Sequence, residues 1–347
     1  NSPVITNREW HRLQDYFGEK AEKIDCSFEV DGGPHALRDA LDQIRRRAED
    51  CVREGRGHLF LSDENVGPSR LPVPMILATA GVHAHLVKQG LRTFTSINVR
   101  ASECLDPHYY AVLVGVGATT VNAYLALDSI ADYQARGLFG DMSVTDAISR
   151  ACKAIDKGLL KIMSKLGISV ISSYRGGYNF EALGLSRALV AEFFPGMPSK
   201  ISGIGLAGIE QKVRQQHEKA FSPQPNMGVG GLYRYRARGE THGFHGPLIH
   251  LLQTAVSRDD FRLYRKYADG VRALPPVSLR DLLDFRITDD IVPVALNTVE
   301  SVTALRKRFV TPGMSMGALS PEAHETLAIA MNRIGAKSVS GEGGEDP

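Results

Sequence analysis

Apolar and polar positions along the chain change between helical and strand-like spacing. In residues 34–54 the apolar side chains recur at intervals of three or four while charged residues fill the other face, which predicts an amphipathic helix. We expect helix through the first 56 residues. The next run, HLFLS at 58–62, is short and apolar and ends at Ser62 and Asp63, which is typical of a buried strand running into a loop.

The same patterns predict the elements that follow. Helices are expected at 74–89, 147–167 and 180–194, and strands at 93–100 and 168–174. Residues 109–118 fit either a strand or a buried helix, because periodicity alone does not separate the two. Strands alternating with helices at this spacing predict βαβ units and an α/β fold with a mostly parallel sheet.

The clearest seam is the stretch SPQPNMGVGG at 222–231. It is rich in proline and glycine, which favours a loop or a domain boundary. Past this seam the apolar spacing predicts helices at 246–256 and 261–271, and Ser278 suits the N-cap of a short third helix.

The end of the chain predicts a strand at 308–310, a Gly/Ser loop, a helix, and a second strand that ends in a Gly/acid-rich loop. The helix has Ser320 at its N-cap, Pro321 at its first position and Gly335 at its end. This order is the opening of an α/β barrel, whose functional groups lie at the carboxyl ends of its strands. Such a barrel needs eight strands to close and about two are present, so we expect a piece of a longer polypeptide.

Composition narrows the class of protein. Hydrophobic residues make up 43% and charged residues 23%, and 41 Lys and Arg face 39 Asp and Glu. These values indicate a soluble globular protein and disfavour a disordered tail or a nucleic-acid binder. No segment has the roughly 18 consecutive apolar residues of a membrane helix, and no signal peptide is evident, so we expect neither a nucleic-acid nor a membrane partner.

The four cysteines lie far apart, with neither a CxxC motif nor Cys/His ligand spacing. We therefore expect small buried apolar side chains in a reducing, cytoplasmic compartment, and no metal ligands. These cysteines are Cys26, Cys51, Cys104 and Cys152.

Two loops near the end of the chain are candidates for chemistry. In TPGMSMGALS, Gly313 and Gly317 allow close approach to the backbone, so the loop could hold a flat aromatic cofactor with Ser315 at its edge; the alternative is a tight turn. In SGEGGEDP three glycines and three acids lie within 341–347. These acids could bind a metal, accept protons or line a polar channel, or they could form a solvated turn.

Other polar positions give weaker signals. Arg175 in SYRGGY suits an anion-binding or domain-contact loop after a strand, or a structural ion pair. His83 and His85 face different directions on a helix, which favours capping or interface roles over a metal pair. The G-x-G of ISGIGL is too short to indicate a dinucleotide site. The basic strip at 234–243 suits domain docking.

Several of these segments together resemble the glutamate synthase family. They are SDENVGPSRLPVPMILATAGVHAHLVKQGLRTFTSINVR, KGLLKIMSKLGISVISSYRGGYNFEALGLS, SKISGIGL, GETHG and RFVTPGMSMGALSPEAHETLAIAMNRIGAKSVSGEGGEDP. The resemblance is collinear over essentially the whole chain and is closest to the large (alpha) subunits of the bacterial NADPH-dependent type.

The resemblance implies two domains. Residues 1–221 correspond to most of the central α/β domain, with its N-terminal part missing. Residues 222–347 correspond to linker helices and the first βαβ elements of a truncated FMN-binding (β/α)8 barrel. The family's glutamine amidotransferase domain, its cluster-binding cysteines and its β-helix have no counterpart here, so we assign no catalytic residue and no iron–sulfur ligand.

The resemblance also implies a reaction. Ammonia released from glutamine travels through a tunnel to the barrel and condenses with 2-oxoglutarate. Reduced FMN then transfers a hydride to the resulting 2-iminoglutarate, so that two glutamates form in all. Electrons come from NADPH through the FAD and 4Fe-4S centres of the small (beta) subunit and a 3Fe-4S cluster elsewhere in the large one. The alternative is a scaffold module with no activity of its own.

Residue by residue, the resemblance places Pro312, Gly313, Met314, Ser315 and Met316 in the flavin-proximal loop. Ser340 and Glu342 match the exit of the ammonia tunnel, where Glu342 would couple the two active sites. The central domain would connect the glutaminase and FMN sites and contribute to the tunnel.

Overall fold

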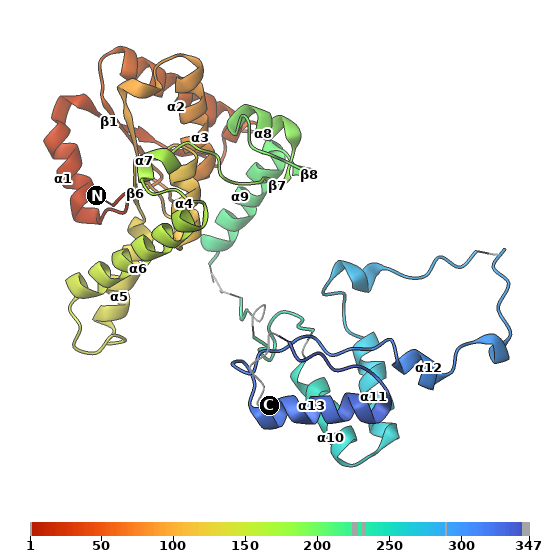
Figure 1. Ribbon diagram of the computed structural model, residues 1–347. Coiled ribbons are helices and arrows are strands. Elements are labelled where there is room, and N and C mark those ends of the chain that lie inside the picture. The colour runs from red at the N-terminus through yellow and green to blue at the C-terminus, as the bar shows by residue number, and fades with distance from the viewer. Residues whose placement is uncertain (1, 224–227, 231–233, 244, 289, 342–347) are drawn as a thin grey trace. The chain divides into compact units, whose positions relative to one another are not determined.

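The computed structural model describes residues 2–223, 228–230, 234–243, 245–288 and 290–341. The chain divides into two compact units, Asn1–Met227 and Gly228–Pro347 (Figure 1). The division falls in the Pro/Gly-rich stretch 222–231, of which 224–227 and 231 lie outside the described residues.

The first unit is built on a four-stranded parallel sheet with the order β1-β3-β5-β6. The strands are β1 (Ala21–Asp25), β3 (His58–Ser62), β5 (Ser96–Arg100) and β6 (Thr120–Asn122). The N-terminal segment extends the sheet beyond β6, because Val121 N–H donates to Pro3 O at 2.8 Å and Ile5 N–H donates to Val121 O at 3.0 Å. The predicted α/β class with a mostly parallel sheet is confirmed.

Helices cover both faces of this sheet. Side chains along β3 alternate: Phe60 meets Trp10 of α1 (Asn7–Phe17) edge to face at 4.9 Å, while Leu59 and Leu61 belong to the larger core. That core also includes the apolar faces of α2 (Ala36–Arg53) and α3 (Met75–Lys88). Burial on both faces explains why β3 is apolar at consecutive positions.

Three of the remaining helices of the first unit begin at a side-chain cap. Asp106, Ser143 and Ser186 accept a backbone N–H at the starts of α4, α6 and α8. The helices are α4 (Pro107–Gly115), α5 (Tyr124–Ala135), α6 (Val144–Lys165), α7 (Ile171–Tyr174), α8 (Arg187–Phe193) and α9 (Leu206–Ala220), with 3-10 turns at Gly18–Lys20 and Arg92–Phe94. The ambiguous run 109–118 is therefore mainly helix α4, buried in the core.

Three helix and strand predictions are wrong. Residues 21–29 form β1 and β2 (Ser27–Glu29) instead of helix, because charged Glu22 and Lys23 on an edge strand hide the strand pattern. The strand predicted at 168–174 is replaced by a loop and the short helix α7, which buries Tyr174. The helix predicted at 180–194 begins only at Arg187, after β7 (Leu183–Leu185).

Two further strand pairs lie outside the main sheet. Strand β2 pairs antiparallel with β4 (Arg70–Pro72), and β7 pairs parallel with β8 (Ile201–Ile204). In the second pair the backbones approach closely: a Cβ added at Gly203 would lie 2.1 Å from Gly184 O. This contact explains why glycine stands at 203 in ISGIGL, with no need for a bound nucleotide.

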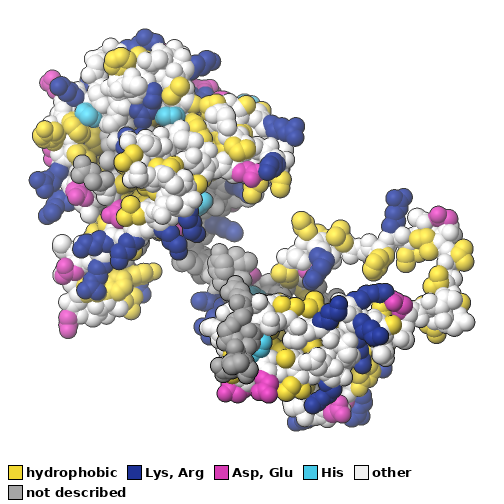
Figure 2. All heavy atoms as spheres, viewed as in Figure 1, with side chains coloured by type: hydrophobic (Ala, Val, Ile, Leu, Met, Phe, Trp, Pro, Cys, Tyr) yellow, Lys and Arg dark blue, Asp and Glu magenta, His cyan; other side chains and the backbone are white. Residues whose placement is uncertain are grey.

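The second unit contains helices α10 (Gly246–Ser257) and α11 (Phe261–Arg272), both predicted, packed on each other. The short helix expected after Ser278 is the 3-10 turn Leu279–Leu282, and Leu296–Thr298 and α12 (Val302–Arg306) follow. Between these three short helical segments the chain is largely extended, and Figure 2 shows hydrophobic side chains along it. Phe285, for example, is 90% exposed.

Helix α13 (Pro321–Ile334) has the predicted ends. Ser320 accepts the N–H of Ala323, Pro321 occupies the first turn, and Gly335 closes the helix in the left-handed conformation (φ +75°). The flanking strands appear as a parallel bridge between Val310 and Lys337. None of the described helices is long and apolar enough to cross a membrane.

Replacing Gly203 with Ala tests the close approach of β7 and β8. We expect G203A to lower the free energy of unfolding by about 2 kcal/mol, because the two backbones must separate to admit the methyl group. G57A is the matched control, since the nearest heavy atom to a Cβ there is 4.0 Å away. Equal urea midpoints for the two variants would contradict this packing.

Candidate functional site

The two candidate loops of the second unit meet because the segments before them pair in parallel. Thr311 N–H donates to Lys337 O at 3.1 Å, and Lys337 N–H donates to Phe309 O at 3.0 Å. Helix α13 connects the two segments, so together they form a β-loop-α-β arrangement. Parallel pairing sends both chains out at the same edge, which brings 312–316 beside 339–341.

Backbone packs against backbone where the two loops meet. A Cβ added at Gly341 would lie 2.7 Å from Met314 O and 2.9 Å from Met314 N, and Gly341 has a φ of +83°. A Cβ added at Gly313 would lie 3.1 Å from Gly341 Cα. Glycine is therefore required at 341 on two counts, since a side chain would clash and the backbone conformation disfavours L residues.

Side-chain hydroxyls hold the shape of the loops. Thr311 Oγ1 accepts the N–H of Val339 at 3.0 Å, and Ser315 Oγ accepts the N–H of Gly317 at 3.1 Å. No described residue accepts the backbone N–H of Gly313, Met314 or Met316. The loop thus presents main-chain donors and two half-buried methionines, Met314 and Met316.

The structure brings most of the predicted site residues together. Pro312, Gly313 and Ser340 are exposed, and Ser315 is half-buried, in this one pair of loops. Glu342 lies outside the described residues, as do the other acids of the SGEGGEDP loop. The close Gly341–Met314 contact escaped sequence reasoning, although two glycine-rich loops after consecutive strands are its signal.

The carboxyl edge of the sheet in the first unit holds a buried acid that sequence reasoning also missed. Asp63 follows β3, is fully buried, and accepts the Ser102 N–H at 2.9 Å and the Ser102 hydroxyl at 2.7 Å. Burial raises the pKa of Asp63 to about 6, against the opposing effect of the Ser102 hydrogen bonds. An acid directly after a buried strand was the available signal.

Nearby charges at this edge are paired. Arg100 contacts Glu64 at 2.7 Å and Asn122 Oδ1 at 2.9 Å, and its guanidinium lies over the Tyr124 ring. These contacts tie the ends of β3, β5 and β6 to one another. They form a structural network and leave Asp63 as the buried acid whose protonation responds to pH near neutrality.

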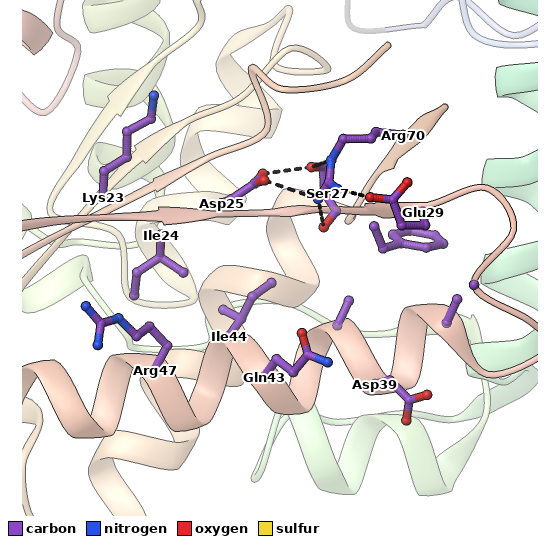
Figure 3. A pocket seen from close by; sticks show the side chains of 14 residues that line it. Lys23, Ile24, Asp25, Ser27, Glu29, Asp39, Gln43, Ile44, Arg47 and Arg70 are labelled. Carbon is purple, nitrogen blue, oxygen red and sulfur yellow. Dashed lines mark hydrogen bonds and ion pairs between the residues drawn. The ribbon is translucent and has the colours of Figure 1, made fainter. Parts of the chain in front are cut away.

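A cavity of about 550 Å³ lies beside strand β1 and helix α2 (Figure 3). Arg70 is one of its charged residues: Nε donates to Ser27 Oγ at 2.8 Å, Nη2 donates to Asp25 Oδ2 at 3.2 Å, and Glu29 forms an ion pair with the same guanidinium. These pairings give Arg70, Asp25 and Glu29 a structural role in the wall of the cavity.

The other candidate residues have separate contacts. His85 Nε2 lies 2.6 Å from Glu49 Oε2, whereas His83 Nδ1 accepts from Arg92 at 2.9 Å. Arg175 follows helix α7 instead of a strand and makes no ion pair with a described residue. All four thiols are free; Cys152 is half-buried and the rest are buried, and no described group of His, Cys, Asp or Glu could hold a metal.

Comparison with known proteins assigns both units. The family model for the glutamate synthase central domain matches residues 1–186, and the model for the conserved region in glutamate synthase matches 242–347. The chain belongs to the glutamate synthase family. The conserved-region match covers both loops of the candidate site, and the central-domain match covers the four-stranded sheet.

Individual relatives agree with this assignment. The chain is 60% identical over its full length to the glutamate synthase [NADPH] large chain of Azospirillum brasilense and 38% identical to that of Bacillus subtilis. It is 37% identical to the chloroplastic ferredoxin-dependent glutamate synthase of Spinacia oleracea. In each case the alignment covers all of this chain but only 22–23% of the relative's length.

The buried carboxyl of Asp63 predicts a pH-dependent stability for this member of the glutamate synthase family. Its folded pKa of about 6 lies above the value of 3.8 expected when unfolded, so the folded state binds the proton more tightly. The stabilisation that the protonated Asp63 carboxyl gives to the folded state is therefore complete below about pH 4 and is lost as the pH rises through 6. Relative to D63N, the wild-type free energy of unfolding should fall by up to about 3 kcal/mol.

Urea unfolding of the 347-residue chain between pH 3.5 and 7.5 measures this difference. The substitution D141N, at an exposed aspartate, serves as the control and should track the wild type at every pH. If the D63N and wild-type curves run parallel over the whole range, Asp63 does not titrate as its burial implies.

Proposed function

We propose that this chain acts as the segment of a glutamate synthase large chain that places one wall of the FMN site next to the exit of the ammonia tunnel. The glycine-dependent contact between loops 312–316 and 339–341 is the observation that supports this proposal most directly. It puts the residues expected at the flavin beside Ser340, expected at the tunnel exit.

The residues present suit one side of a flavin ring. Free backbone donors at Gly313, Met314 and Met316 can bond the polar edge of the ring. Met314 and Met316 supply polarisable apolar contacts. Bound FMN would supply hydride transfer to an imine formed from ammonia and 2-oxoglutarate.

The chain's own task is orientation. Thr311 and Ser315 hold the loop through main-chain hydrogen bonds, so the reacting groups would meet a wall of fixed shape. Holding the tunnel exit within the same pair of loops would deliver ammonia to the flavin before it reaches water and is protonated. Glu342 would couple the state of the flavin site to the activity of the glutaminase site.

The proposed overall reaction converts glutamine and 2-oxoglutarate to two glutamates. NADPH is favoured as electron donor, with a small (beta) subunit carrying FAD and 4Fe-4S centres, because identity is 60% to an NADPH large chain and 37% to a ferredoxin-dependent enzyme. A 3Fe-4S cluster would lie elsewhere in the large chain.

The first unit would serve as the connector between the glutaminase and FMN sites. At the sheet edge Arg100 pairs with Glu64, and in the cavity of Figure 3 Arg70 pairs with Asp25 and Glu29. This internal pairing favours a structural role for the unit within the enzyme.

Substituting Gly341 tests the flavin wall. In the full-length large chain, G341A should weaken FMN binding roughly tenfold, about 1.4 kcal/mol, because the added methyl group pushes loop 312–316 away. Flavin absorbance after dialysis against limiting FMN measures the occupancy. G243A, where a Cβ meets no atom within 4 Å, is the control; unchanged occupancy in G341A would refute the proposal.

Substituting Glu342 tests the coupling of the two sites. In the full-length enzyme E342A should uncouple glutamine hydrolysis from glutamate synthesis, so that ammonia accumulates when both substrates and reductant are supplied. The ratio of ammonia released to glutamate formed is the readout, and E325A on the exposed face of α13 is the control. A ratio identical to that of the wild type would show that Glu342 has no such role.

A further inference from the structure

The loop SYRGGY at 173–178 is attached to the end of helix α4 but is not used by the proposed function. Gly176 N–H donates to Val114 O at 3.1 Å, and Tyr178 N–H donates to Gly115 O at 3.2 Å. Tyr178 has a positive φ of +47°, which is uncommon for a residue other than glycine. The loop is thus held in a specific conformation by its backbone.

Three polar atoms in this loop are buried without a partner. They are the hydroxyls of Tyr174 and Tyr178 and the Nε of Arg175. The Tyr174 side chain is only 1% exposed, so its hydroxyl has little access to water. Buried polar groups are nearly always hydrogen-bonded in folded proteins, so three unpaired ones within five residues leave hydrogen-bonding capacity for a ligand.

The loop also contributes an uncompensated positive charge. Arg175 makes no ion pair with a described residue, and its charge acts on a second guanidinium, that of Arg92. Burial lowers the pKa of Arg175, and burial together with the charge of Arg175 lowers the pKa of Arg92 to about 10. Two cations held together without an acid favour an anion between or beside them.

Arg92 and His83 are already committed to neighbouring groups. Arg92 donates from Nε to His83 Nδ1 at 2.9 Å, from Nη1 to Thr95 O at 2.6 Å and from Nη2 to Gly117 O at 2.8 Å. Because Nδ1 accepts, the neutral His83 ring has its proton on Nε2. A Cβ added at Gly176 would lie 3.0 Å from that nitrogen, so a further donor adjoins the loop.

We propose that loop 174–178 is a carboxylate-binding site in which the Arg175 guanidinium is the charged partner and the hydroxyls of Tyr174 and Tyr178 are additional donors. Each of the unpaired groups can donate a hydrogen bond, which suits an anion with several acceptor oxygens. A planar carboxylate matches the fork of a guanidinium. The ligand is either a small free acid or the side chain of an acidic polypeptide segment, which present the same group.

Calorimetric titration of the 347-residue chain at constant ionic strength tests the site with three probes: acetate, succinate and a glutamate-rich peptide. We expect saturable binding of at least one probe that R175Q weakens tenfold or more. Y178F, which removes only the hydroxyl, should weaken it severalfold while the circular dichroism spectrum stays that of the wild type. R150Q, at an exposed arginine of α6, should bind as the wild type does.

The probes also separate the two sources of the carboxylate. Tighter binding of succinate than of the peptide assigns the site to a small free acid, and the reverse order assigns it to an acidic polypeptide segment. Absence of saturable binding by all three probes would overturn the proposal. So would binding that R175Q leaves unchanged.

Discussion

Parallel pairing of strands determines where the polar groups of both units lie. In the first unit the register of β3 with β5, Ser62 opposite Arg100, brings Asp63 against Ser102 at one edge of the sheet. In the second unit the bridge between Val310 and Lys337 brings two glycine-rich loops into backbone contact. Because parallel strands end at the same edge, the strand pairing by itself brings residues that are far apart in sequence together there.

The two edges use this geometry differently. At the edge of the first unit almost every charge has a partner, and Arg100 is held by Glu64, Asn122 and the Tyr124 ring. The loops of the second unit are held by two hydroxyls but leave main-chain donors unpaired. Satisfied groups stabilise a fold, whereas unsatisfied groups are available to a ligand. The two family models match the residues of both edges.

Sequence reasoning succeeded where local signals decide the structure. The strand at 58–62 and the ends of α13 follow from an apolar run and from cap chemistry, and both are confirmed. It failed where tertiary contacts decide: β1 is charged because it lies at a sheet edge, and 171–174 is helical because Tyr174 packs in the core.

The candidate site was foreseen in part for the same reason. Glycine-rich loops after consecutive strands predict a shared edge, so the proximity of 312–316 to 339–341 follows from the pattern. The requirement for glycine at 341 depends on where Met314 O lies, and the unpaired donors around Arg175 depend on which acids are absent from its surroundings. Neither is encoded in local spacing.

The proposed flavin wall is tested most directly by the structure of the full-length large chain with FMN bound, which gives the distance from the flavin ring to the backbone of 313–315. We expect van der Waals contact, within about 4 Å; a ring bound elsewhere in the barrel, with these loops in solvent, would contradict the proposed flavin wall.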